Sequence, residues 1–311
     1  MANVDKIEEL REQLRLDAEN VELRFEFANA LFSAGFTKES LAQFKFLSEV
    51  LTDKFEVFNK LGICYEKLKD FKNAASAYEK ALEINPKNLD TVFNLGLAYV
   101  TVGEFELAKM CFLEILGKDE NDSNSYFYLG FCCFKLNDLE SALESFKKVV
   151  ELNDEDLYAH FYMGNIYNSQ GNFELAKHEF NRVLEIDEEY SWAYYNLANI
   201  AIAEEDYEQA VVCLDRTVEL NPKDEEAFRN YARILTVNEL YDDAREVMER
   251  ALESCPNKGN ILYCIAKIYQ AEGRNKEYIE YLNNAIDNSS TLTIAVEDVR
   301  HELLFAPKPE G

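Results

Sequence analysis

The sequence contains few of the residues that interrupt helices. Only 11 glycines and 5 prolines occur among 311 residues, which is too few turn-forming residues for a β-sandwich or β-barrel of this length. Alanine, leucine, glutamate and lysine are abundant instead, and these residues favour helix. Because 48% of the residues are apolar, the chain has enough material for a core, which argues against general disorder.

Basic residues and long apolar runs are also scarce. Against 59 acidic residues stand 32 basic ones, so the net charge is −27, and such a surface repels nucleic-acid phosphates and anionic membranes. The acidic residues either keep the protein soluble or form a surface that binds a basic partner. No apolar run reaches the roughly 18 residues of a membrane span, and residues 1–10 do not resemble a signal peptide. We therefore expect a cytoplasmic protein that binds neither nucleic acid nor membrane.

Recognisable catalytic and metal-binding motifs are absent. The seven cysteines form no CxxC pair, which favours reduced, buried thiols over a disulfide framework. His160, His178 and His301 match no metal-ligand spacing. The sequence has no GxSxG, P-loop, GxGxxG or HExxH motif. We therefore expect no enzyme activity, no cofactor and no metal.

The sequence does contain an internal repeat of 34 residues. Small residues recur at this spacing at Ala28, Gly62, Gly96, Gly130, Gly164, Ala198, Ala232 and Ala266. A second alanine phase runs through Ala74, Ala108, Ala142, Ala176, Ala210 and Ala244, and a glycine phase contains Gly35, Gly103, Gly171 and Gly273. In each unit, apolar residues at helical spacing fall into two segments separated by a break. The small residues are expected where the two helices of a unit approach most closely.

One segment resembles a known repeat closely. The stretch VFNKLGICYEKLKDFKNAASAYEKALEINP at 57–86 is similar to the tetratricopeptide repeat, a helix–turn–helix unit of 34 residues. The residues that match its pattern are Phe58, Leu61, Gly62, Tyr65, Ala74, Tyr78, Ala81 and Pro86. The first unit departs from the pattern at Arg24 and Ser40, and the eighth departs at Tyr278. The resemblance implies an all-α, right-handed superhelical solenoid of antiparallel helix pairs.

The repeat divides the chain into three parts. Residues 1–20 are expected to form an N-terminal capping half-repeat, and residues 293–311 a C-terminal capping helix and tail, because a solenoid needs polar ends. Between them we expect eight repeats at 21–54, 55–88, 89–122, 123–156, 157–190, 191–224, 225–258 and 259–292.

The resemblance also implies that the first helices of the units line a concave groove. These helices are nearly neutral, so most of the charge lies on second helices, turns and ends. The groove candidates in aromatic and asparagine positions are Phe93, Asn94, Phe127, Phe161, Asn165, Tyr195, Asn196, Asn199 and Asn230. Asparagine can both donate to and accept from a peptide backbone, and aromatic rings supply contact area. The alternative is that these residues only serve packing, because they are close to the average unit of the family.

A basic spot stands out in this acidic chain. Arg229 and Arg233 lie one helical turn apart, and Lys267 occupies the position in the next unit that corresponds to Arg233. An arginine fork can hold a carboxylate with two parallel hydrogen bonds, as basic residues at such positions do in a peptide-clamping relative. The alternative is local pairing of Arg229 with Glu225 or Glu226 in its own helix.

The sequence therefore predicts a non-catalytic protein–protein interaction scaffold or adaptor that binds an extended peptide segment in its groove. A sensor of short peptides and a regulatory subunit of an enzyme complex remain as alternatives. In each case the partner is a protein or peptide.

Overall fold

A computed structural model of the chain describes residues 2–307, and within that range every regular element is helical. The chain divides into two compact units, residues 1–159 and 160–311. The first contains α1 (Ala2–Leu16), α2 (Val21–Ser33), α3 (Thr37–Val50), α4 (Phe55–Lys67), α5 (Phe71–Ile84), α6 (Leu89–Val102), α7 (Phe105–Leu116), α8 (Ser123–Lys135) and α9 (Leu139–Leu152). The boundary between the units lies within α10 (Leu157–Ser169).

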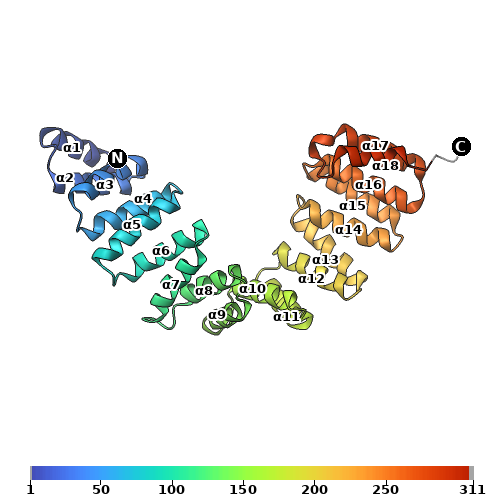
Figure 1. Cartoon of the computed structure of the whole chain (residues 1–311), viewed down its shortest axis with the longest axis horizontal. Coiled ribbons are helices and arrows are strands. Elements are labelled where there is room, and N and C mark those ends of the chain that lie inside the picture. The colour runs from blue at the N-terminus through green and yellow to red at the C-terminus, as the bar shows by residue number, and fades with distance from the viewer. Residues whose placement is uncertain (1, 308–311) are drawn as a thin grey trace. The chain divides into compact units, whose positions relative to one another are not determined.

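The second unit continues with further helices and ends on a short one. It contains α11 (Phe173–Ile186), α12 (Ser191–Ala203), α13 (Tyr207–Leu220), α14 (Glu225–Val237), α15 (Tyr241–Ser254), α16 (Lys258–Glu272), α17 (Asn275–Asp287), the 3-10 helix η1 (Ser289–Thr291) and α18 (Val296–Leu304). Within each unit, successive helices pack against one another in chain order (Figure 1). The predicted all-α fold of stacked helix pairs is confirmed. The division into eight repeats remains a prediction, and α16 begins one residue before the window expected at 259.

The turn inside each helix pair repeats a single backbone conformation. Residues with positive φ occur every 34 positions, at Gly35, Lys69, Gly103, Asn137, Gly171, Glu205, Glu239 and Gly273. Glycine reaches this left-handed region without steric cost, but Lys69, Glu205 and Glu239 adopt it with φ of 62°. The left-handed turn expected from the repeating glycines is therefore also present where another residue takes the place of glycine.

The core between paired helices depends on the small-residue phase. A Cβ atom placed on Gly62 would come within 2.5 Å of the Tyr78 ring, and one on Gly164 within 2.7 Å of Phe180. Gly96 and Gly130 face Phe112 and Phe146 in the same way. The aromatic ring of the second helix therefore lies directly on the backbone of the first. The second alanine phase, from Ala74 to Ala244, is fully buried.

Both ends of the described chain are covered by single helices. On one side, α1 packs Ile7, Leu10 and Leu14 against Phe27 and Leu31 of α2. At the other end, α18 buries Val299 in a cluster with Ala266, Tyr278 and Leu282. None of the helices in the described range is long and apolar enough to cross a membrane.

Candidate functional site

The basic residues singled out in the sequence line one cavity in the second unit. This cavity of about 360 Å³ lies between α14 and α16. Arg229, Asn230 and Arg233 border it from α14, and Lys267 borders it from α16. We call it the basic cavity. Its lining is completed by Ala232, Thr236, Val237, Tyr263, Cys264 and Ile268.

The repeat places these residues together for a simple reason. Arg229 and Arg233 are four residues apart on a helix, so their side chains leave the same face. Their helix belongs to one helix pair and α16 to the next, and α14 contacts α16 directly. Lys267 therefore lies across the cavity from the two arginines.

Neither arginine has an ionic partner among the described residues. Within residues 2–307, neither Arg229 nor Arg233 lies within 4.0 Å of a carboxylate oxygen, although both side chains are exposed. The acids that could pair with Arg229 in its own helix are engaged elsewhere. Glu225 accepts hydrogen bonds from Asn257 at 2.8 Å and Asn260 at 2.9 Å, and Glu226 lies close enough to Tyr195 to raise the pKa of its hydroxyl. The alternative of local pairing is not the arrangement seen in the structure.

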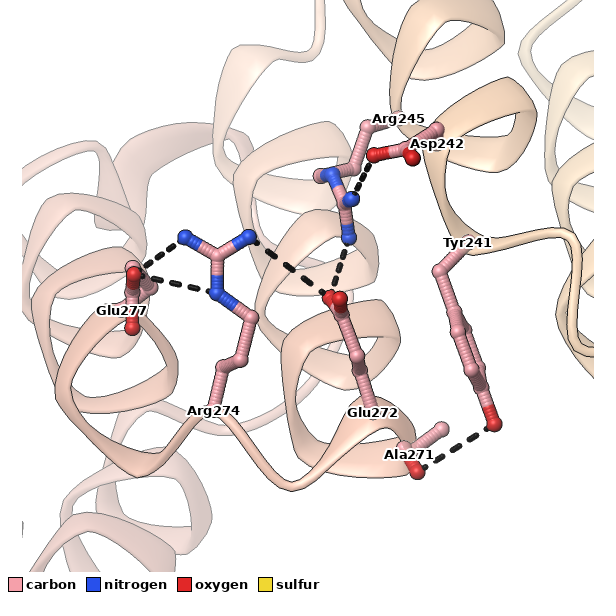
Figure 2. A network of polar contacts seen from close by, with 7 residues as sticks. All are labelled: Tyr241, Asp242, Arg245, Ala271, Glu272, Arg274 and Glu277. Atoms are coloured by element: carbon pink, nitrogen blue, oxygen red, sulfur yellow. Dashed lines mark hydrogen bonds and ion pairs between the residues drawn. The ribbon is translucent and has the colours of Figure 1, made fainter.

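A nearby cluster shows how arginines are otherwise used in this unit. Figure 2 shows Arg245 of α15 bound both to Asp242 of its own helix and to Glu272 at the end of α16. Arg274 binds Glu277 and also approaches Glu272, with Nη1 3.8 Å from Oε2. These cations stabilise the contact of successive helices, since each is neutralised by carboxylates. Arg229 and Arg233 lack such a structural role.

Lys267 differs from the two arginines because a carboxylate already binds it. Its Nζ atom contacts Oε1 of Glu302 in α18. The same carboxylate accepts hydrogen bonds from Tyr278 at 2.7 Å and from Tyr263 at 2.9 Å. Burial raises the pKa of Glu302, but these three donors lower it more, so the net pKa is below its usual value. Glu302 could not be identified as a partner of Lys267 from the sequence, because this contact depends on how the capping helix packs.

Cys264 adds a thiol to the wall of the basic cavity. Burial raises the pKa of this thiol to about 11, although the nearby Arg229 acts in the opposite direction. It is only half-buried, whereas the other six cysteines are buried. At neutral pH the group is therefore a protonated, weakly nucleophilic thiol.

Two further candidates lie beside the cavity on α12. The Nδ2 atom of Asn230 donates to the Tyr195 hydroxyl at 3.1 Å. Burial, followed by the hydrogen bond to Glu226, raises the pKa of Tyr195, while a bond to Asn199 opposes this shift. Tyr195, Asn199 and Asn230 thus form a neutral polar patch next to the two arginines.

The other candidates are largely occupied by contacts inside the protein. The rings of Phe93, Phe127 and Phe161 are half-buried, and they lie 5.7, 5.8 and 6.0 Å from Phe112, Phe146 and Phe180 of the paired helices. Asn165 and Asn196 donate their Nδ2 atoms to carbonyl oxygens four residues earlier, at 3.0 and 2.7 Å. Asn94 and Phe93 line a separate cavity of about 530 Å³ in the first unit. That cavity also holds Asp90, Asp119 and Asp122, so its lining is acidic.

Comparison with known proteins settles the family. Models described as tetratricopeptide repeat match residues 55–88 and 123–156, residues 77–110, and residues 167–234. The chain belongs to the tetratricopeptide-repeat family. No curated protein matches it. Within residues 5–307, no group of three or more His, Cys, Asp and Glu side chains is arranged to hold a metal ion.

Several solved structures share the fold. The C-terminal part of a TPR protein from Cytophaga hutchinsonii has a TM-score of 0.62 at 19% identity, over 74% of this chain and 95% of that one. A TPR protein from Parabacteroides merdae has a TM-score of 0.57 at 17% identity, over 80% and 97%. YrrB, a TPR protein with an unusual peptide-binding site, has a TM-score of 0.51 at 24% identity, over 60% and 96%. At these identities the likeness shows the fold alone.

Proposed function

We propose that this TPR protein is a non-catalytic scaffold or adaptor that docks an extended segment of a partner protein. The docking face in the second unit is formed by α12, α14 and α16, with the basic cavity at its centre. Arg229 and Arg233 anchor one acidic group of the segment. The observation that carries this proposal is the pair of guanidinium groups that line a cavity without an ionic partner in the described chain.

The neighbouring side chains suit an extended backbone. Asn165 and Asn196 use their Nδ2 atoms inside their own helices, which orients each Oδ1 atom as an acceptor for a partner N–H group. Asn199, Asn230 and Tyr195 continue this polar patch toward the cavity. In the first unit, the partly exposed rings of Phe93 and Phe127 and the amide of Asn94 offer a second, weaker contact face. The existence of a peptide-binding site in YrrB is consistent with this use of the fold.

The negative electrostatic field of the protein limits which partner segments can bind. With a net charge of −27, the surface repels a generally acidic ligand. A segment that is neutral or basic apart from one acidic anchor satisfies both the cavity and the surrounding charge.

The test compares partner capture by matched variants. Wild type and Arg229→Ala/Arg233→Ala are immobilised and exposed to lysate of the native cell, and captured proteins are quantified by mass spectrometry. The control is Lys147→Ala/Arg216→Ala, which removes the same charge from the exposed Lys147 of α9 and the half-buried Arg216 of α13. We expect proteins that are retained by wild type and control but lost from the double arginine variant. Titration with segments of such a partner should then show weakening of about tenfold or more per lost contact. Equal capture by all three proteins would eliminate the site.

A further inference from the structure

The basic cavity carries more positive charge than the protein itself neutralises. Three cationic groups border it, and among the described residues a carboxylate, that of Glu302, pairs with Lys267 alone. Of the nine other arginines, all but Arg24 and Arg300 have an acidic partner among the described residues: Arg11, Arg15, Arg182, Arg216, Arg245, Arg250 and Arg274. Like charges one turn apart on a helix destabilise it. An excess of two positive charges in a chain of net charge −27 therefore indicates an anionic ligand.

The walls of the cavity add a second requirement. Ala232, Ile268 and Val237 border it together with the ring of Tyr263. Ala232 and Ile268 are buried, whereas Val237 is 63% exposed although it is apolar. A bare ion would leave these apolar surfaces in contact with water, so the ligand that fits carries its charge on an apolar or side-chain stem.

We propose that the basic cavity binds a phosphorylated side chain of the partner segment, and that phosphorylation of the partner thereby controls docking. This inference rests on the proposed function, since it names the anchor of that same site. A phosphomonoester carries about −1.5 to −2 charges at pH 7 and three acceptor oxygens. It matches the two unneutralised guanidinium forks, each of which can form two parallel hydrogen bonds with phosphate oxygens. A single carboxylate neutralises only one of them.

The negative surroundings sharpen this preference. An acidic stretch of several carboxylates would spread its charge over a surface that repels it. A phosphate concentrates the same charge at the point where the protein is positive. The basic cavity surrounded by an acidic surface therefore favours a ligand with one compact dianion over a ligand with several dispersed carboxylates.

The test uses degenerate peptides of fixed length with amidated C-termini and identical flanks. The central residue is phosphotyrosine, phosphoserine, unmodified tyrosine, unmodified serine or glutamate, and a further set with central serine ends in a free carboxylate. Binding of the wild-type chain is measured by fluorescence anisotropy. We expect at least one phosphorylated set to bind about tenfold or more tightly than every other set. The preference should be lost in Arg229→Ala/Arg233→Ala and kept in Lys147→Ala/Arg216→Ala. Arg229→Lys/Arg233→Lys should retain part of it, because lysine keeps the charge without the fork.

Occupancy of the cavity has an independent readout in Cys264. Its alkylation by iodoacetamide at about pH 9 should slow when the phosphorylated peptides are present. Inorganic phosphate serves as a competitor, and displacement at equal concentration would show that the cavity binds free phosphate instead of a phosphorylated side chain.

The outcomes separate the two proposals. If the glutamate or free-carboxylate peptides bind as tightly as the phosphorylated ones, the phosphate assignment is wrong and the docking function with an acidic anchor stands. If no phosphorylated set binds better than its unmodified counterpart, the assignment is likewise wrong. If, in addition, partner capture is unchanged in the double arginine variant, the proposed function fails as well.

Discussion

Single residues decide how each helix pair closes. Within residues 2–307, the turn residue has a positive φ at eight positions, but only four of them hold glycine. For an L-residue other than glycine, the left-handed conformation costs about 1–2 kcal/mol. The positions filled by Lys69, Glu205 and Glu239 therefore hold local strain that the packing of the two helices maintains.

Because of this strain, we expect substitutions to and from glycine at equivalent turn positions to change the stability of the protein in opposite directions. Glu239→Gly should raise the free energy of unfolding by about 0.5–1 kcal/mol, because glycine adopts a φ of 62° freely. Gly273→Ala should lower it by a similar amount, although no atom lies within 4 Å of the added Cβ. Urea denaturation of both variants measures the difference. Two shifts of the same sign would contradict the assignment of strain to φ.

Another set of single residues sets the distance between paired helices. A Cβ atom on Gly130 would lie 3.0 Å from the ring of Phe146, whereas one on Gly117 would meet only two backbone oxygens, at 3.4 and 3.5 Å. The two glycines therefore differ in what a larger side chain would displace.

We accordingly expect Gly130→Leu to be clearly more damaging than Gly117→Leu. Overpacking against Phe146 should cost about 1–3 kcal/mol. Gly117 is exposed near the end of α7, where the added side chain can point to solvent. Thermal unfolding followed by circular dichroism compares the two, and identical melting curves would show that the helix contact does not lie at Gly130.

At the scale of elements, one carboxylate links α18 to both α16 and α17. Glu302 joins Lys267 and Tyr263 of α16 to Tyr278 of α17. The short helix itself buries little beyond Val299. The polar contacts of Glu302 are therefore a large part of what holds α18 in place.

The position of α18 should consequently depend on pH through Glu302. The net pKa of Glu302 is lowered, since the donors outweigh burial, so the ionised form is favoured in the folded chain. Its stabilising contribution is complete above the ordinary value of 4.5 and is lost as the pH falls through the lower folded-state value. Glu302→Gln should speed hydrogen exchange in residues 296–304 at pH 7. The difference from wild type should shrink below pH 4.5, and a difference that grew on acidification would contradict this role.

The sequence was sufficient to predict the helices, but it was not sufficient to predict all of the side-chain contacts between them. The 34-residue spacing was sufficient to predict the helix pairs, because the period records which residues face the core. It also brought Arg229, Arg233 and Lys267 together, since equivalent positions of neighbouring repeats lie side by side. The contact of Glu302 with Lys267 was not predictable, because the capping helix lies outside the repeat. The engagement of Glu225 by Asn257 and Asn260 depends on side-chain geometry that periodicity does not contain.

At the scale of the whole molecule, the chain is held together by contacts between neighbouring helices. Helices pack mainly against those next to them in the sequence. The stability of such an array is close to a sum of repeat terms and neighbour interfaces. Its integrity should therefore depend on the alternation of first and second helices more than on its length.

This alternation can be tested by two internal deletions. Removal of residues 89–156 joins the end of α5 to the start of α10, so a second helix is still followed by a first helix. Removal of residues 89–138 is a smaller change, but it places α5 directly before α9 and brings two second helices into succession. We expect the larger deletion to give a helical protein that unfolds cooperatively at lower denaturant concentration, because interfaces have been lost. The smaller deletion should give a poorly packed or aggregating protein, because the buried face of α9 no longer meets that of α8. Circular dichroism, size-exclusion chromatography and urea titration distinguish the two, and equal tolerance of both deletions would contradict the repeat architecture as the source of stability.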